Sequence, residues 1–242
     1  MLENKKVIIF DLDGTLIDSV GIWNKIDEEL IKTLGTVPFD NVNIGKQRDS
    51  KLKEFCNEED IYLEYCGFLK DKYGFNESKE ETKKIRYDIA HKYLKDKIDY
   101  KTNAEDVLKY LKEKGYILAI ASTTNDYTIL TYKTENENII KKANFDDYFT
   151  LIYSKGAVKN LKPNPEVHLK ILDTLNVKPE ECLIIEDSLI GTEAAVAAKI
   201  DVAIMYDKYS DADRDKINEL SNYQFNSFNE LLNSIKNELE KR

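Results

Sequence analysis

The chain has 242 residues, 42% of them hydrophobic, which is enough for one large domain or a domain with an insertion and too apolar for a disordered protein. Its formal net charge of -9 argues against nucleic acid as the main partner, because proteins that bind nucleic acid usually carry a basic face. No apolar run resembles a signal peptide or approaches the roughly 18 residues of a membrane-spanning helix, and the three cysteines form no CxxC pair. We therefore expect a cytoplasmic protein with no membrane partner, and we favour a monomer.

Short apolar runs that alternate with helical segments predict an open α/β sheet. The first run, VIIF, leads directly into Asp11, and later runs read ILAIA, CLIIE and VAIM. Such runs, apolar on both faces, are typical of parallel strands that helices cover on both sides. We predict strands at residues 6–10, 117–122, 150–153, 182–186 and 202–205, with helices between them.

The segment between the first and second predicted strands breaks this alternation. It is polar, charged and helical in period, as in IWNKIDEELIKTL and IYLEYCGFLKDKY. We predict that residues 17–97 form an inserted helical domain and that residues 1–16 and 98–242 form the α/β core.

Polar side chains follow the predicted strands or lie in a loop between them. Asp11 and Asp13 come directly after the first strand. The other polar groups of this kind are Ser122, Lys162 (in LKPNP), Glu186 and Asp187. Because ligands of open parallel sheets bind at the carboxyl ends of the strands, we expect these groups to converge on one edge of the sheet.

The residue types at this edge indicate a site for a phosphoryl group. Four carboxylates together resist ionisation, and a hard cation such as Mg²⁺, which prefers oxygen ligands, removes that conflict. Lys162 adds a positive charge, and the Ser122 hydroxyl adds a hydrogen-bond donor. Of two carboxylates at positions i and i+2, one can attack phosphorus and form an aspartyl phosphate, while the other transfers protons.

Each of these features also has an ordinary structural interpretation. An Asp-x-Asp-Gly sequence is often a turn, a lone Ser at a strand end is usually structural, and a Lys before Pro is usually solvated. The acids before Ser188 could merely favour the N-terminus of a helix. All the features occur together, in order and at one predicted edge, and this conjunction favours the catalytic interpretation.

Four motifs of the chain resemble those of the haloacid dehalogenase-like superfamily of phosphotransferases: DLDGT, the Ser after ILAIA, the Lys of KPNP, and IIEDS. The helical insertion after the first motif is similar to the cap of the β-phosphoglucomutase-like subgroup. The resemblance covers nearly the whole core. It implies a Rossmann-like parallel sheet with helices on both faces, an inserted α-helical cap domain, and Mg²⁺ as the cofactor.

The resemblance also implies a role for each motif residue. Asp11 is the nucleophile, and Asp13 is the general acid/base, which also gives a backbone carbonyl to Mg²⁺. Asp187 is a Mg²⁺ ligand, and Glu186 binds the ion directly or through water. The residues that hold the phosphoryl group are Ser122, Thr123, Lys162 and Gly14.

Compared with β-phosphoglucomutases, the chain has one further similarity, in the predicted cap, and two differences. β-Phosphoglucomutases resemble this chain in GKQRDS, where Arg48 fits an Arg that binds a second phosphate. They usually carry His twelve residues after the nucleophile, where this chain has Trp23, and often Val or Ile where it has Thr15. Trp23 either lines the substrate pocket or packs between cap and core.

We therefore predict a phosphatase, that is, a phosphoric monoester hydrolase, which uses Mg²⁺ to hydrolyse a small phosphorylated metabolite. Two alternatives stay open: a β-phosphoglucomutase-like phosphosugar mutase, and a non-enzymatic phosphate-binding protein. Steady phosphate release distinguishes the first from the other two.

Overall fold

The computed structural model describes residues 1–40, 43–55 and 58–241 of the chain. These residues divide into two compact units, one formed by Met1–Val20 and Ile98–Arg242, and the other by Gly21–Lys97. Among the described residues, no helix is both long and apolar enough to cross a membrane. Cys66 and Cys182 are free and buried, whereas Cys56 lies outside the described residues.

The described residues of the first unit form a six-stranded parallel sheet in the order β3-β2-β1-β4-β5-β6. Its strands are β1 (Val7–Phe10), β2 (Ile117–Ala121), β3 (Leu151–Tyr153), β4 (Cys182–Glu186), β5 (Asp201–Met205) and β6 (Tyr223–Phe225). The five predicted strands are present, with bounds that differ by at most one residue. The edge strand β6 was not predicted, because its sequence YQF is too short and too polar to stand out as a buried run.

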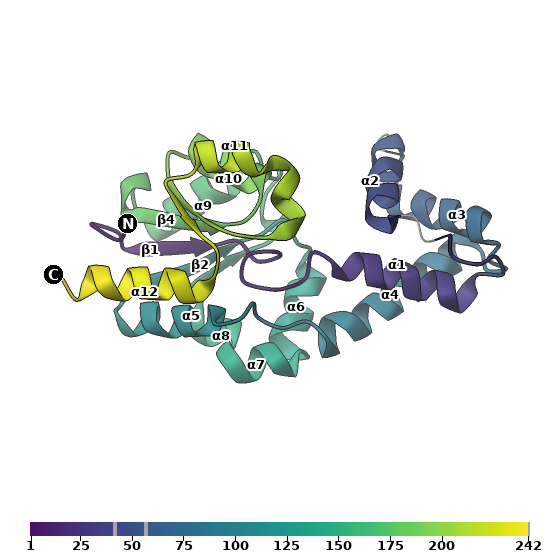
Figure 1. Ribbon diagram of the computed structural model, residues 1–242, viewed down its shortest axis with the longest axis horizontal. Helices are drawn as coiled ribbons and strands as arrows, with labels where there is room; N and C mark the ends of the chain where they lie inside the picture. The colour runs from purple at the N-terminus through teal and green to yellow at the C-terminus, as the bar shows by residue number, and fades with distance from the viewer. Residues whose placement is uncertain (41–42, 56–57, 242) are drawn as a thin grey trace. The chain divides into compact units, whose positions relative to one another are not determined.

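Helices cover both faces of this sheet, which confirms the predicted Rossmann-like α/β fold (Figure 1). One face carries α9 (Glu166–Leu175), α10 (Leu189–Ala197) and α11 (Arg214–Leu220). The opposite face carries α5 (Ala104–Glu113) and α12 (Phe228–Leu239). Three short helices follow β2, namely α6 (Asp126–Thr134), α7 (Glu137–Ala143) and α8 (Phe145–Tyr148).

The central strand β1 shows why these sequences form a buried sheet. Its side chains alternate between the two faces. Val7 and Ile9 belong to the apolar cluster that includes Val167 and Ile171 of α9. Phe10, on the other face, makes an edge-to-face contact with Phe149, with ring centroids 6.2 Å apart. Since β1 is covered on both sides, its carboxyl end is held in a fixed position.

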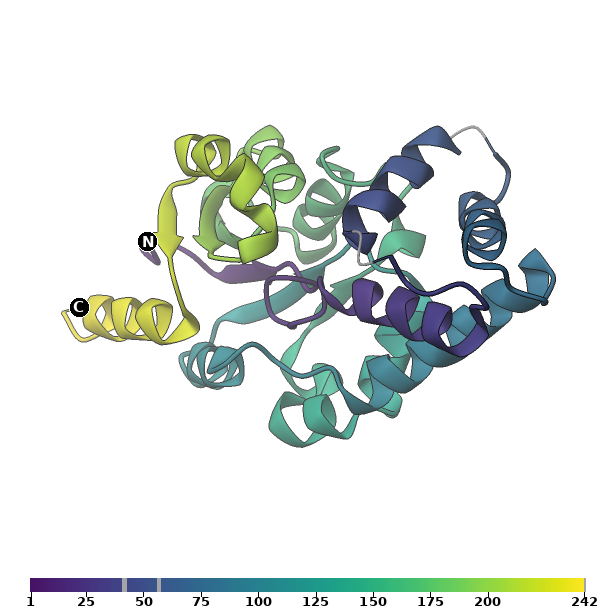
Figure 2. The same cartoon turned by 45° about the vertical axis from the view of Figure 1, so that its right-hand side comes forward.

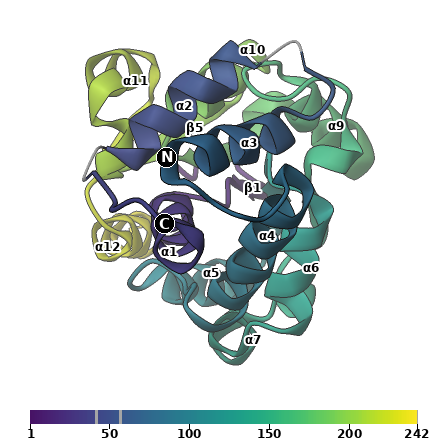
Figure 3. The same cartoon turned by 90° about the vertical axis from the view of Figure 1, so that its right-hand side faces the viewer.

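The regular secondary structure among the described residues of the second unit is helical. Its helices are α1 (Ile22–Leu34), α2 (Ile44–Glu54), α3 (Ile61–Tyr73) and α4 (Lys79–Asp96). Helix α4 lies beside α1 (Figure 2) and also packs against α3, while α2 contacts α3 (Figure 3). Ser78 and Glu81 form a capping box that begins α4, and Gly74 ends α3 in the left-handed conformation.

Candidate active site

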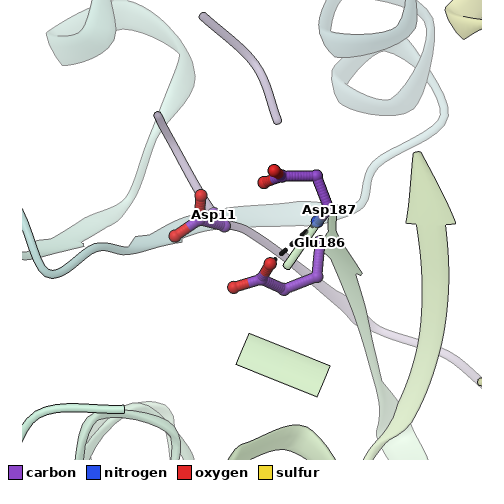
Figure 4. Close-up of side chains that lie close together, drawn as sticks. All are labelled: Asp11, Glu186 and Asp187. Carbon is purple, nitrogen blue, oxygen red and sulfur yellow. Dashed lines mark hydrogen bonds between the residues drawn. The ribbon is translucent and has the colours of Figure 1, made fainter. Parts of the chain in front are cut away.

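Three carboxylates meet where the neighbouring strands β1 and β4 end. Asp11 follows the last residue of β1, Glu186 is the last residue of β4, and Asp187 follows it. One oxygen from each carboxylate lies within 4.8 Å of the others, and all three residues are buried (Figure 4). The parallel register of the two strands thus places three acids at one point, as the sequence predicts.

The Lys162 side chain lies between two of these acids. Its Nζ atom is 2.7 Å from Oδ1 of Asp11 and 2.7 Å from Oε1 of Glu186. Burial by itself would lower the pKa of Lys162, but the charges of Asp11 and Glu186 outweigh that effect and raise it above its ordinary value. Lys162 is therefore a buried cation at neutral pH.

One lysine does not compensate all three acids. Burial raises the pKa of Asp11 to about 7, although Lys162 opposes the shift. Burial, together with the charges of Glu186 and Asp11, raises the pKa of Asp187 well above its ordinary value. Both carboxyl groups would ionise more readily beside an additional cation.

The Glu186 carboxylate accepts hydrogen bonds from a lysine, two backbone N–H groups and a hydroxyl group. Besides Lys162, it accepts hydrogen bonds from the backbone N–H groups of Asp187 and Ser188, at 2.8 and 2.9 Å, and from the Ser188 hydroxyl at 3.0 Å. A Cβ atom at Gly191 would lie 1.6 Å from Oε1 of Glu186, so this buried position depends on glycine in α10. Glu186 thereby fixes both Lys162 and the start of α10.

Asp187 is oriented by the residues of the first motif. The Thr15 hydroxyl donates to Oδ1 of Asp187 at 2.7 Å, in a fully buried position. Gly14 has a φ of +92°, and a Cβ atom there would lie 2.5 Å from Oδ2 of Asp187. Both the backbone conformation and the close approach therefore require glycine at position 14. Sequence reasoning did not assign Thr15 to the site, although its place directly after Gly14 was visible.

The Asp13 side chain has a different environment. Among the described residues, the acids close enough to share a metal ion are Asp11, Glu186 and Asp187, so the Asp13 carboxylate stands apart from them. Its oxygens accept hydrogen bonds from three hydroxyl groups: Ser19 at 2.5 Å, Thr124, and Tyr132 at 3.5 Å. These three residues were missed at the sequence level, because nothing in their local sequence indicates that they face an acid.

A cavity of about 200 Å³ connects these groups. The predicted residues that line it are Asp11, Asp13, Ser122, Thr123, Lys162, Glu186 and Asp187. Ile190 and Tyr209, which are about half exposed, add apolar surface to the lining. The cavity therefore combines a buried cation, hydroxyl groups and carboxyl groups, two of which have raised pKa values, a combination typical of catalytic sites.

The two predicted cap residues lie in the second unit, where Arg48 contacts a buried acid and Trp23 contacts the arginine that pairs with that acid. Arg48 donates from Nη1 to Oδ2 of Asp27 at 3.1 Å, and Asp27 has no exposed surface. Asp27 also accepts from Nε of Arg86 at 2.6 Å and from the Tyr65 hydroxyl at 3.0 Å. The Arg86 guanidinium lies 4.9 Å from the centre of the Trp23 ring. Arg48 and Trp23 thus contribute to the packing of this unit, and their contact with a substrate stays a prediction.

Comparison with known proteins identifies the family of this chain. Residues 8–205 match the family described as haloacid dehalogenase-like hydrolase, so the match extends from β1 to the end of β5. The chain belongs to this family. The hydrolase is 30% identical over 202 residues to a phosphoglycolate phosphatase of Aquifex aeolicus, covering 82% of this chain and 84% of the relative. It is 25% identical over 196 residues to a phosphorylated carbohydrates phosphatase of Thermotoga maritima, covering 81% and 82%.

Solved structures show the same fold. A β-phosphoglucomutase-like protein from Thermotoga maritima superimposes with a TM-score of 0.77 and 22% identity, over 96% of the hydrolase and 99% of that chain. CbbY from Rhodobacter sphaeroides, solved in complex with phosphate, has a TM-score of 0.67 and 19% identity, over 94% and 96%. These likenesses confirm the predicted architecture of the hydrolase.

Proposed function

We propose that this hydrolase is a Mg²⁺-dependent phosphatase that cleaves a small phosphorylated metabolite through an aspartyl phosphate on Asp11. The observation that carries the proposal is that Asp11, Lys162 and Asp13 line the same cavity. There a nucleophile is 2.7 Å from a buried cation, and a second carboxylate is held by hydroxyl groups.

The broad enzyme class follows from the comparisons with known proteins. The family is one of hydrolases, and similar proteins from Aquifex aeolicus and Thermotoga maritima are named as phosphatases. Both findings confirm the sequence-based prediction of a phosphoric monoester hydrolase. The metal, the covalent intermediate and the substrate belong to the proposal.

The acids at the ends of β1 and β4 suit a Mg²⁺ ion. They offer only oxygen atoms, and burial, together with the neighbouring acids, raises the pKa values of Asp11 and Asp187, which a bound cation would oppose. Asp11, Asp187 and the backbone carbonyl of Asp13 would hold the ion, with Glu186 binding directly or through water. When bound, Mg²⁺ would neutralise acid charge and charge on the phosphate oxygens.

Protein groups perform the chemical steps in two stages. In the first, Lys162 and Ser122 hold the phosphoryl oxygens while a carboxylate oxygen of Asp11 attacks phosphorus. The bond to the leaving oxygen breaks, and Asp13 gives that oxygen a proton. In the second stage Asp13 takes a proton from water, whose oxygen attacks phosphorus and releases phosphate and the free Asp11 carboxylate.

The relatives suggest where to look for the substrate. Those named above are a phosphatase of phosphorylated carbohydrates and a phosphatase of phosphoglycolate. We therefore propose a small phosphorylated sugar or acid as the substrate class. The mutase alternative remains because β-phosphoglucomutase-like proteins share the fold, although Trp23 stands where such mutases would carry histidine.

A phosphate-release assay over a panel of phosphosugars, phosphoglycolate and nucleotides tests the proposal. We expect Mg²⁺-dependent release from at least one compound over many turnovers. β-Glucose 1-phosphate with a trace of the 1,6-bisphosphate should give slow hydrolysis at most. Formation of glucose 6-phosphate faster than phosphate release would establish the mutase. The absence of both activities would favour a phosphate-binding protein.

A further inference from the structure

We propose that Thr124 is a positioning residue that orients the Asp13 carboxyl group toward the leaving oxygen. The proposal rests on the proposed function, because it assigns a role within the proton-transfer step of that reaction. It begins from the hydrogen bond that the Thr124 hydroxyl donates to Oδ2 of Asp13.

The Asp13 carboxylate is held from two directions. Ser19, near the end of the loop that follows β1, donates to Oδ1 at 2.5 Å, while Thr124 donates to Oδ2 from the loop after β2. The two oxygens therefore have separate partners, which restricts rotation of the carboxyl group. Such a restriction matters for a proton donor, because a displacement of about 1 Å from the reacting geometry can cost roughly a hundredfold in rate.

The backbone around Thr124 is itself fixed. Its N–H donates to the Ser122 hydroxyl at 3.1 Å, and its carbonyl accepts from the N–H of Lys155 at 2.8 Å. The next residue, Asn125, caps α6 by accepting from the N–H of Thr128 at 2.8 Å. A side chain on a backbone tied in this way is suited to hold a neighbouring group in place.

Thr124 lies in the loop that also carries a proposed ligand of the phosphoryl group. Ser122, in the same short loop, lines the cavity and is proposed to hold the phosphoryl group. Thr124, two residues later, holds the acid that must reach the oxygen leaving that group. One loop therefore sets the distance between the phosphoryl group and its proton donor. The Thr124 hydroxyl can donate to the Asp13 carboxylate and accept from the protonated form, so it can keep its partner through the cycle.

The role of Thr124 predicts an effect that depends on the leaving group. Phenolate is a poor leaving group and needs the proton of Asp13, whereas p-nitrophenolate leaves readily without one. Thr124→Val keeps the shape of the side chain and removes the hydroxyl. We expect this variant to lower kcat/KM on phenyl phosphate by about ten- to a hundredfold, up to the lower end of the contribution of general acid catalysis, and on p-nitrophenyl phosphate by no more than about threefold. The comparison uses kcat/KM because it reports only the steps up to departure of the leaving group, whereas kcat also includes the second stage, in which Asp13 acts as a base on both substrates.

Two further variants separate positioning from folding. Thr124→Ser restores a hydroxyl and should recover most of the phenyl phosphate activity. Thr131→Val removes a buried hydroxyl from α6 that donates to the carbonyl of Tyr127, one helical turn earlier, at 3.1 Å, and should leave both activities unchanged. If Thr124→Val does not fold, as judged by its urea unfolding curve, Thr124→Ala takes its place in the comparison.

The outcomes are distinct. Selective loss on phenyl phosphate in Thr124→Val, with recovery in Thr124→Ser, supports positioning of the acid. Equal losses of kcat/KM on both esters, or none on either, would overturn it, although the phosphatase proposal would stand. A wild-type protein that releases phosphate from neither ester nor from the metabolite panel would overturn the proposed function and this inference with it.

Discussion

The Nζ atom of Lys162 lies 2.7 Å from Oδ1 of Asp11, and both side chains are buried. The two residues are 151 positions apart in the sequence, so only the folded sheet brings them together. The same Nζ atom is 2.7 Å from Oε1 of Glu186. Lys162 therefore compensates the charge of two buried acids at the place where we propose that it holds the phosphoryl group.

Removal of this cation should lower both activity and stability. Lys162→Met keeps much of the side chain and leaves Asp11 and Glu186 buried without their lysine. Because breaking a buried ion pair from one side usually costs about 3–5 kcal/mol, we expect a large fall in the free energy of unfolding. Urea denaturation measures it. The exposed Lys170, changed to Met in the same way, provides the control, and equal stability of the two variants would contradict the prediction.

The stability of the metal-free protein should fall as the pH rises toward neutrality. Burial raises the pKa of Asp11 to about 7 in the folded protein, from 3.8 for an exposed carboxyl group. Between these values the folded state binds the proton more tightly than the unfolded state, so raising the pH costs stability, by at most about 1.4 kcal/mol per pH unit. The Asp11→Asn variant has no carboxyl group at this position, so it lacks this titration.

The difference between wild type and Asp11→Asn isolates this effect from other titrating groups. In excess EDTA, the stability of the wild type relative to the variant should fall as the pH rises from about 5 to about 7. Urea denaturation at several pH values measures this trend. If the difference in free energy of unfolding between the two proteins is constant, or rises with pH, burial of Asp11 does not set the pH dependence of stability. Saturating Mg²⁺ should reduce the slope, because the ion stabilises the ionised carboxylate.

Activity should depend on a hard divalent cation. Chelation should abolish phosphate release and Mg²⁺ should restore it, while Ca²⁺ should inhibit because its larger, looser coordination misplaces the nucleophile. Asp187→Asn should raise the Mg²⁺ concentration needed for half-maximal activity by at least about tenfold. Metal titrations of wild type and variant measure both effects. Full activity after exhaustive dialysis against excess EDTA would refute the metal requirement.

Arg48→Ala distinguishes a structural role from substrate binding. The bond between Arg48 and the buried Asp27 favours a structural role, in which the variant loses activity by the same factor on p-nitrophenyl phosphate and on a sugar bisphosphate. Kinetics on both substrates measure the ratio. A rise in KM of ten- to a hundredfold on the bisphosphate alone, equivalent to about 1.5–3 kcal/mol, would instead show that Arg48 binds a second phosphate.

The sequence predicted those parts of the site that follow from sheet topology. Asp11, Ser122 and Asp187 follow buried strands, and the parallel arrangement alone brings such positions to one edge. The hydroxyl partners of Asp13 were missed, because Thr124 and Tyr132 are 111 and 119 residues away from it in the sequence. Their orientation is set by tertiary packing, which leaves no periodic signal.

The cap illustrates the same limit. The helical periodicity of the sequence predicted a helical insertion, and the secondary structure described there consists of the helices α1 to α4. The buried pair of Asp27 and Arg86 joins α1 to α4 across 59 residues, and charged residues on a helix are ordinarily assigned to its exposed face. The sequence therefore linked Arg48 to a second phosphate of a substrate, and its bond with Asp27 was missed.

The most direct test of the central claim is the intact mass of the protein quenched in acid during hydrolysis of p-nitrophenyl phosphate with Mg²⁺. We expect part of the wild-type protein to carry one added phosphoryl group, which peptide mapping places on Asp11, and none to be added to Asp11→Asn. The variant should release phosphate at background rate. A phosphoryl group on another residue, or an Asp11→Asn protein that keeps more than about a hundredth of the wild-type rate, would contradict the account.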